Sequence, residues 1–232
     1  LGGLVVGVSG GIDSAVVSTL CAETGLPTYV ITMPLDSKKE NTELSNLHAK
    51  ELDEKYENVE ILDIDLSGVF HTLISTIGLQ TSKEGYTYNR DLITNEHSNA
   101  NTKSRLRMVT LYQVAGSVGG IVVGTGNKVE DYGVGFYTKY GDGGVDIAPI
   151  ADLYKTEVWE LGKHLGVDSR IIEATPTDGL WNDGRTDEDQ LGTTYVALEE
   201  AMESGTGDAV KILETFNNMN SHKMNPIPTF KL

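Results

Sequence analysis

The sequence predicts an α/β protein built on a doubly wound parallel sheet. Three short apolar segments, 4–8, 28–33 and 59–64, are typical of buried strands because they are rich in valine and isoleucine. Segments of helical character separate them, and strands that alternate with helices favour parallel pairing. The 232 residues are 39% hydrophobic, which is enough to bury one core. We therefore expect a single domain over residues 1–232.

The composition limits the partners and the compartment. Acidic residues outnumber basic ones by 34 to 18, which gives a net charge of −16, whereas surfaces that bind nucleic acid are basic. Apolar runs stay far below the length of a membrane span, and no signal-peptide pattern is visible. The single cysteine, Cys21, rules out a disulfide within the chain and fits a reducing compartment. We expect a cytoplasmic protein that binds neither nucleic acid nor membrane.

The chain is organised around the stretch from Ser9 to Ser14, Ser-Gly-Gly-Ile-Asp-Ser, which joins the first strand to a helix. A glycine-rich turn at this place aims backbone N–H groups at an anion and lets the main chain approach phosphate oxygens. Both serines add hydroxyl donors, and Asp13 in the first helical turn could hold a metal ion. The stretch lacks the lysine of a Walker A loop and the spacing of a dinucleotide fingerprint. An ordinary strand-to-helix turn stays open as the alternative.

A long loop is expected between the third and fourth strands. A polar helix is predicted over about 41–56, and a mixed helical stretch runs to about residue 79. Residues 80–100 are polar and show little periodicity. Loops of this length in compact domains are commonly functional, so we predict a lid over the site here. An ordinary surface excursion is the alternative.

The next helix is predicted to bury one face. Apolar residues recur at i, i+3, i+4 and i+7 from Met108 to Ala115. Arg105 falls on the same face, whereas Arg107 points elsewhere. A guanidinium on a buried face needs an anionic partner, because an unpaired buried charge is strongly destabilising. Arg105 is therefore expected to meet either an anionic ligand or an internal carboxylate.

A fourth strand, 120–124, is followed at once by polar residues. In doubly wound sheets, ligands bind at the carboxyl ends of strands where the strand order reverses. We expect the first and fourth strands to be neighbours there, so that Thr125 and Glu130 face the Ser9–Ser14 stretch. A hydroxyl and a carboxylate at this place suit a nucleotide and a hard cation such as Mg²⁺.

The second half of the chain offers more polar groups. Residues 136–146 hold three glycines within four positions, and Lys139 and Asp146 on either side could bind a polar ligand, although a hairpin-like turn alone would look similar. Lys155 begins a predicted helix, where a cation is unfavourable unless an anion such as phosphate lies nearby. The remaining elements are expected to be a short helix near 170–172, a polar segment reaching 189, helices over about 195–204 and 208–218, and a polar tail.

Taken together, these motifs resemble the ammonia-dependent, single-domain NAD synthetases, which are N-type ATP pyrophosphatases with a Rossmann-like adenine nucleotide alpha hydrolase fold. The resemblance runs from about Leu4 to Lys223. Its most distinctive part is the string Thr-Lys-Tyr-Gly-Asp-Gly-Gly that begins at Thr138. The other motifs that carry it are residues 9–14, 104–108, 124–125 with Glu130, 176–177 and 222–223.

The resemblance implies that the enzyme uses ATP to join ammonia to the carboxylate of deamido-NAD through an adenylated intermediate, releasing AMP and pyrophosphate. It places around ATP the residues Gly7, Val8, Ser9, Gly10, Gly11, Ile12, Asp13, Ser14, Thr125, Lys155 and Thr177. It assigns Mg²⁺ to Asp13 and Glu130, and catalysis to Asp13, Lys155 and Thr177. It assigns deamido-NAD to Arg105, Lys139, Asp146, His222 and Lys223. Members of the family are homodimers, with the dinucleotide near the interface. We add the hypothesis that Asp178 helps to remove the proton from ammonium.

The chain departs from the family pattern in two places, and other reactions share its first motif. Residues 126–128 are Gly-Asn-Lys, and one extra residue lies between Glu130 and Lys139. The alternatives are amination of the GMP synthetase kind, tRNA thiolation and a nucleotide sensor without turnover. Thiolation wants a reactive cysteine and a basic surface, which Cys21 inside a helix and the negative charge disfavour. A separate glutaminase stays open as a source of ammonia.

Overall fold

The computed structural model describes residues 2–82, 85–177, 179–180 and 185–230. Its centre is a sheet of four parallel strands in the order β3-β2-β1-β6. Leu4 pairs with Thr28 on one side and with Ile121 on the other. The strand order therefore reverses between β1 and β6, as the sequence predicts. The strands are β1 (Leu4–Val8), β2 (Thr28–Thr32), β3 (Val59–Asp63) and β6 (Ile121–Val123).

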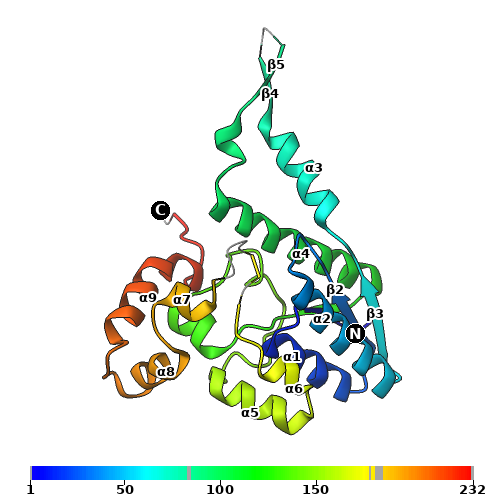
Figure 1. Ribbon diagram of the computed structural model, residues 1–232, viewed down its shortest axis with the longest axis vertical. Coiled ribbons are helices and arrows are strands. Elements are labelled where there is room, and N and C mark those ends of the chain that lie inside the picture. Colours follow the sequence, from blue (N-terminus) through cyan, green and yellow to red (C-terminus); the bar gives the residue numbers. More distant parts are fainter. Residues whose placement is uncertain (1, 83–84, 178, 181–184, 231–232) are drawn as a thin grey trace.

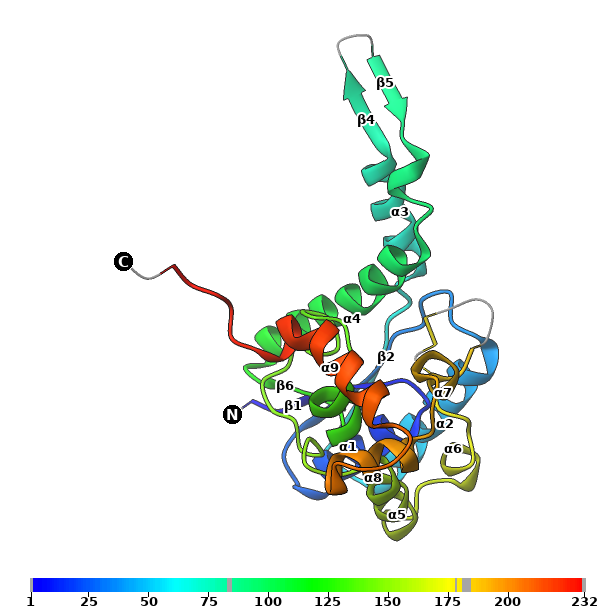
Figure 2. The same ribbon diagram turned by 90° about the vertical axis from the view of Figure 1, so that its left-hand side faces the viewer.

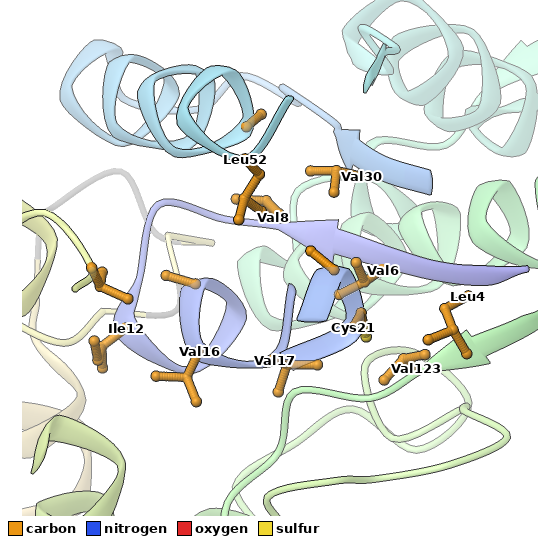
Figure 3. Packing of buried hydrophobic residues seen from close by; sticks show 14 of the residues in the cluster. Leu4, Val6, Val8, Ile12, Val16, Val17, Cys21, Val30, Leu52 and Val123 are labelled. Atoms are coloured by element: carbon orange, nitrogen blue, oxygen red, sulfur yellow. The ribbon is translucent and has the colours of Figure 1, made fainter. Parts of the chain in front are cut away.

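Helices cover both faces of the sheet, which confirms the doubly wound prediction (Figure 1). Alternate residues of β1 point to opposite faces: Val6 belongs to the core drawn in Figure 3, whereas Val5 packs with Phe70 and Ala115 in the other. The first core uses α1 (Ile12–Glu23), α2 (Lys39–Lys55), α5 (Lys155–Leu165) and α6 (Ser169–Ile172). The second uses α3 (Ser67–Gly78) and α4 (Glu96–Val118).

The prediction of a long loop over residues 80–100 is wrong. Antiparallel strands β4 (Leu79–Ser82) and β5 (Gly85–Tyr88) and the 3-10 helix η1 (Arg90–Leu92) occupy it, and α4 begins at Glu96. Together with α3, the hairpin projects from the body as an arm (Figures 1 and 2). Tyr86 on the arm is 75% exposed. Within the described part of this stretch, only His97 and Ala100 line the main cavity of the protein, so the hairpin is not the predicted lid.

The C-terminal helices form a third core beside the sheet. Tyr195 and Leu198 of α8 pack with Val129 and Val134 of the π-helix η2. The last helix is longer than predicted and carries His222 in its final turn. The elements concerned are η2 (Lys128–Val134), α7 (Asp187–Leu191), α8 (Tyr195–Ser204) and α9 (Val210–Met224). Among the helices of the described residues, none is both long and apolar enough to cross a membrane.

A buried histidine makes the stability of this fold depend on pH. His48 of α2 is 2% exposed, and its Nε2 lies 2.9 Å from the Ser18 Oγ of α1. Burial lowers the pKa of His48 from 6.5 to about 4. Because the unfolded chain takes up this proton at higher pH than the folded one, the stabilisation is complete above about pH 6.5 and is lost as the pH falls towards 4.

We expect this one residue to remove about 3 kcal/mol of unfolding free energy between pH 7 and pH 4, at about 1.4 kcal/mol for each pKa unit. The measurement is urea unfolding at both pH values for the wild type and for His48→Gln. The variant should lose less stability on acidification than the wild type. An equal loss in both proteins would show that His48 is not the titrating group.

Candidate active site

A cavity of about 760 Å³ opens at the carboxyl ends of β1 and β6. It brings together almost all of the residues that the sequence singles out. The predicted residues that line it are Gly7, Val8, Ser9, Gly10, Gly11, Ile12, Asp13, Ser14, Arg105, Thr125, Glu130, Lys139, Lys155, Thr177, His222 and Lys223. Asp146 is not among the described residues that line it. Asp178 lies outside the described residues.

The Ser9–Ser14 stretch folds into a tight turn at the start of α1. The Ser9 N–H donates to Ser14 Oγ at 3.1 Å, and the Ser14 hydroxyl donates to the Gly11 carbonyl at 3.0 Å. Gly10 has φ +88°, and a Cβ there would come within 2.6 Å of the Asn41 carbonyl oxygen, so only glycine fits. No side chain caps α1. Its first N–H groups therefore remain available to an anion in the cavity.

The Lys155 ammonium lies between two carboxylates, one of which belongs to this turn. Its Nζ is 2.5 Å from Asp13 Oδ2 and 3.1 Å from Glu130 Oε1, and its side chain is 3% exposed. Burial alone would lower the pKa of Lys155, but the charges of both carboxylates outweigh burial and raise it. Burial also opposes ionisation of Glu130, but Lys155 and a tyrosine hydroxyl outweigh it and lower the pKa of Glu130. At Asp13, burial and the charge of Glu130 outweigh Lys155 and raise the pKa of the carboxyl above its ordinary value. Lys155 and Glu130 are therefore the two groups that the cluster holds in their charged forms.

Tyr195 supports this cluster from the C-terminal core. It is 1% exposed, and its hydroxyl donates to Glu130 Oε1 at 2.7 Å. Asp187 Oδ2 lies 3.3 Å from the Tyr195 hydroxyl oxygen. The Lys155 ammonium lies 4.9 Å from the centre of the Tyr195 ring. Tyr195 is not among the site residues that the sequence predicts. The sequence pattern that could have indicated it is a tyrosine on the predicted buried face of a helix. A buried hydroxyl needs a polar partner, so such a tyrosine points to a polar group nearby.

The segment after β6 forms a π-helix, and it carries Glu130. A π-helix arises when one residue is inserted into an α-helix, and such helices are frequent at functional sites. Asp131 of this helix also lines the cavity, and burial together with neighbouring carboxylates raises its pKa to about 8.

Basic residues from three segments of the chain also line the cavity. Arg105 Nε donates to the Lys139 carbonyl at 3.3 Å, and the Lys139 ammonium donates to the His222 carbonyl. The Lys223 ammonium donates to the carbonyls of Gly135 and Tyr137. The prediction that Arg105 lies on a buried face is wrong, because this residue is exposed. The neighbouring Lys103 and Ser104 of α4 are buried instead, so the buried side of this part of the helix does not include Arg105.

Arg107, which was expected to point elsewhere, also lines the cavity, and its Nε donates to the Met33 carbonyl at 3.3 Å. Asp146 lies apart from this basic group. Its Oδ2 accepts from the Val122 N–H at 2.8 Å, and its Oδ1 accepts from the Tyr112 hydroxyl at 3.0 Å. Asp146 is therefore tied to the start of β6 and to the outer side of α4.

The glycine-rich string that begins at Thr138 is held against α4. Asp142 Oδ1 accepts from the Ser104 hydroxyl at 2.6 Å and from the Thr138 N–H at 3.0 Å. A Cβ on Gly141 would come within 2.2 Å of Ser104 Oγ, which explains the glycine. These contacts hold Lys139 next to Arg105. The Thr177 hydroxyl oxygen accepts from the Gly179 N–H at 3.2 Å, and both residues line the cavity.

Comparisons with known proteins agree on one family. A sequence model described as NAD synthase matches residues 1–227. The NH(3)-dependent NAD(+) synthetase of Carboxydothermus hydrogenoformans is 38% identical over 224 residues, which cover 95% of this chain and 86% of that protein. The protein of the same name from Methanococcoides burtonii is 42% identical over 204 residues, covering 87% and 71%.

Solved structures show the same likeness. The structure of NMN synthetase from Francisella tularensis has a TM-score of 0.84 and 33% identity, with 99% of this chain and 90% of that chain covered. The NH3-dependent NAD synthetase from Campylobacter jejuni, solved with nitrate, has a TM-score of 0.73 and 27% identity, with 99% and 90% covered. By sequence and by fold, the chain belongs to the NAD synthase family.

Proposed function

We propose that this chain is an ammonia-dependent NAD synthetase that converts deamido-NAD into NAD at the expense of ATP. The names of its relatives and its family support the reaction. The observation that carries the proposal is one cavity lined by two different groups of residues. The Ser9–Ser14 turn with Lys155 suits a triphosphate, and the cluster around Arg105 and Lys139 suits a second anionic substrate.

The chemistry explains why the enzyme needs both groups of residues, one for ATP and one for the acid. A carboxylate is a poor acyl donor, because oxide would have to leave. An oxygen of the substrate carboxylate attacks the α-phosphorus of ATP, the bond to the β-phosphate bridge breaks, and pyrophosphate leaves. Ammonia then attacks the acyl carbon, AMP departs with the bonding electrons, and the nitrogen loses a proton. Lys155 and the N–H groups of α1 offset the repulsion between the two anions, so the protein contributes mainly orientation and electrostatics.

Mg²⁺ is the metal that fits the donor set. Asp13 and Glu130 already converge on one cation, the ammonium of Lys155. Within the described residues no cluster of three or more His, Cys, Asp or Glu side chains could hold a metal. Mg²⁺ is commonly bound through one or two carboxylates together with phosphate oxygens and water, so two carboxylates suffice. When bound, the ion would neutralise charge on the triphosphate and on the leaving pyrophosphate.

The proposal is tested by incubating the enzyme with ATP, Mg²⁺, ammonium and deamido-NAD and resolving the products by phosphorus NMR. AMP, pyrophosphate and NAD should form in equal amounts. ADP with phosphate, or ATP turnover that ignores deamido-NAD, would contradict it. Glutamine in place of ammonium should give no NAD, because the thiol of Cys21 is buried and its pKa is raised to about 12.

One of the similar structures suggests a second acid as a candidate substrate. It is that of the NMN synthetase from Francisella tularensis, with a TM-score of 0.84, against 0.73 for the Campylobacter jejuni NAD synthetase. Nicotinic acid mononucleotide presents the same carboxylate without the adenylate half. The ratio of kcat/KM for the two acids, measured with the same ATP and ammonium concentrations, decides between them.

We also propose that the enzyme is a homodimer, as its family resemblance implies. Asp146 is expected to bind deamido-NAD, yet it lies outside the cavity. Exposed apolar side chains lie near Asp146, namely Val109 and Tyr112 on α4 and the adjacent Ile147. A second copy that covers this patch would let Asp146 reach the substrate of the partner. Sedimentation velocity should give twice the mass of one chain, and a monomer at micromolar concentration would contradict the proposal.

A further inference from the structure

A fully buried asparagine connects the two carboxylates of the site. Asn127 follows β6 and is 0% exposed. Its Nδ2 donates to Asp13 Oδ1 at 3.0 Å. Its Oδ1 accepts from the N–H groups of Val129 and Glu130, both at 3.1 Å. One side chain thus contacts the carboxylate carried by α1 and the first turn of the helix that carries the other carboxylate.

These contacts determine which carboxylate oxygens face the cation that the site already holds, the ammonium of Lys155. Asn127 takes Oδ1 of Asp13, whereas Oδ2 of the same carboxylate meets Lys155. On the other side, Glu130 Oε1 meets Lys155 as well. Asp13 and Asn127 are 114 residues apart in the chain, so this hydrogen bond also joins the phosphate turn to η2. Loss of the bond would free the Asp13 carboxylate to rotate.

Capping of η2 alone does not explain an asparagine here. A cap needs only an acceptor oxygen, which serine, threonine or aspartate supplies equally well. Asp13 needs a donor as well. A serine or threonine hydroxyl has donor and acceptor on a single oxygen, whereas the amide carries them on two atoms, so that Nδ2 meets Asp13 while Oδ1 caps η2. An aspartate at this position would bring a second carboxylate against Asp13.

We propose that Asn127 is a positioning residue that orients the Asp13 carboxylate and the start of η2, so that Asp13 and Glu130 present oxygens to the same cation. This inference rests on the proposed function, in which these two carboxylates bind Mg²⁺. Partners that hydrogen-bond to metal-binding carboxylates commonly contribute 10- to 100-fold, as an order of magnitude, to metal affinity.

The test compares two asparagines that both contact η2. Asn127→Ser keeps a capping oxygen but lacks the second polar atom, the amide nitrogen, that donates to Asp13. The matched control is Asn217→Ser, because the Asn217 amide donates to the Gly133 carbonyl of the same helix at 3.2 Å and does not line the cavity. The readout is Mn²⁺ affinity, measured by electron paramagnetic resonance in the presence of α,β-methylene-ATP. This analogue cannot transfer adenylate to the acid, because the carbon bridge between its α- and β-phosphorus does not break.

We expect Asn127→Ser to bind Mn²⁺ about 10- to 100-fold more weakly than the wild type, and Asn217→Ser to bind it equally well. The Mg²⁺ concentration for half-maximal activity should rise in parallel, with a smaller change in kcat at saturating Mg²⁺. Wild-type Mn²⁺ affinity in a folded Asn127→Ser protein would overturn the inference while leaving the proposed function intact. A wild-type enzyme that binds no Mn²⁺ would overturn both.

A second variant keeps the test decisive if Asn127→Ser does not fold. Asn127→Asp has nearly the same shape and retains the capping oxygen, but it replaces the donor by a second carboxylate beside Asp13. We expect it to weaken Mn²⁺ binding at least as much as Asn127→Ser. Affinity equal to that of the wild type would again overturn the inference.

Discussion

Asp13→Asn is expected to lose about a thousandfold in kcat/KM while the fold survives, which is the order of magnitude for removing one charge-stabilising group from a preorganised site. The substitution keeps the shape of the side chain and removes the charge that faces Lys155. Lys155 retains Glu130 as an ionic partner, so no buried charge is left alone. Steady-state turnover of deamido-NAD and the circular dichroism spectrum are the measurements.

A matched control separates charge at the site from charge elsewhere. Asp168→Asn makes the same change at a carboxylate that pairs with the exposed Arg170 on the surface. Its activity should equal that of the wild type. Activity within tenfold of the wild type in Asp13→Asn would contradict the role given to Asp13.

Lys155→Met is expected to destabilise the protein by about 3–5 kcal/mol at neutral pH in EDTA, because it leaves two largely buried carboxylates without a cation. The side chains of Asp13 and Glu130 are only 16% and 17% exposed. Methionine fills much of the same volume, so the loss reflects charge rather than packing. Urea unfolding followed by circular dichroism measures it, with an unchanged slope against denaturant as the check that the unfolded state is the same.

The control for this variant lies on the same helix. Lys163→Met removes an exposed ion pair with Glu160, whose side chains are 55% and 74% exposed. Exposed pairs of this kind contribute at most about 1 kcal/mol. Equal destabilisation by the two lysine variants would show that the site cluster is not under electrostatic strain when its cation is removed.

Much of the fold could be predicted from local patterns. The buried strands carry continuous apolar runs, and their alternation with helices determines the parallel order that places Thr125 and Glu130 opposite the Ser9–Ser14 stretch. The β4–β5 hairpin could not be predicted in this way. Its strands have four residues each, and every described side chain of β5 is exposed, so no buried face leaves a periodic signal.

The site was predictable where chemistry lies in a contiguous motif and not where it depends on distant contacts. Tyr195 reaches Glu130 across 65 residues, and Asn127 reaches Asp13 across 114. Neither contact has a local pattern, because each depends on how the C-terminal core and η2 pack beside the sheet. The burial of Lys155 was missed for the same reason: a lysine in a first helical turn suggests an exposed cation, and only the fold brings two carboxylates to it.

The central claim is that this cavity activates a carboxylate by transferring adenylate to it. Deamido-NAD labelled with ¹⁸O in both carboxylate oxygens tests this claim most directly. If the carboxylate attacks the α-phosphorus, one ¹⁸O atom per turnover must appear in the phosphoryl group of AMP, where mass spectrometry and the isotope shift in phosphorus NMR detect it. AMP without the label, or label in pyrophosphate, would contradict the account.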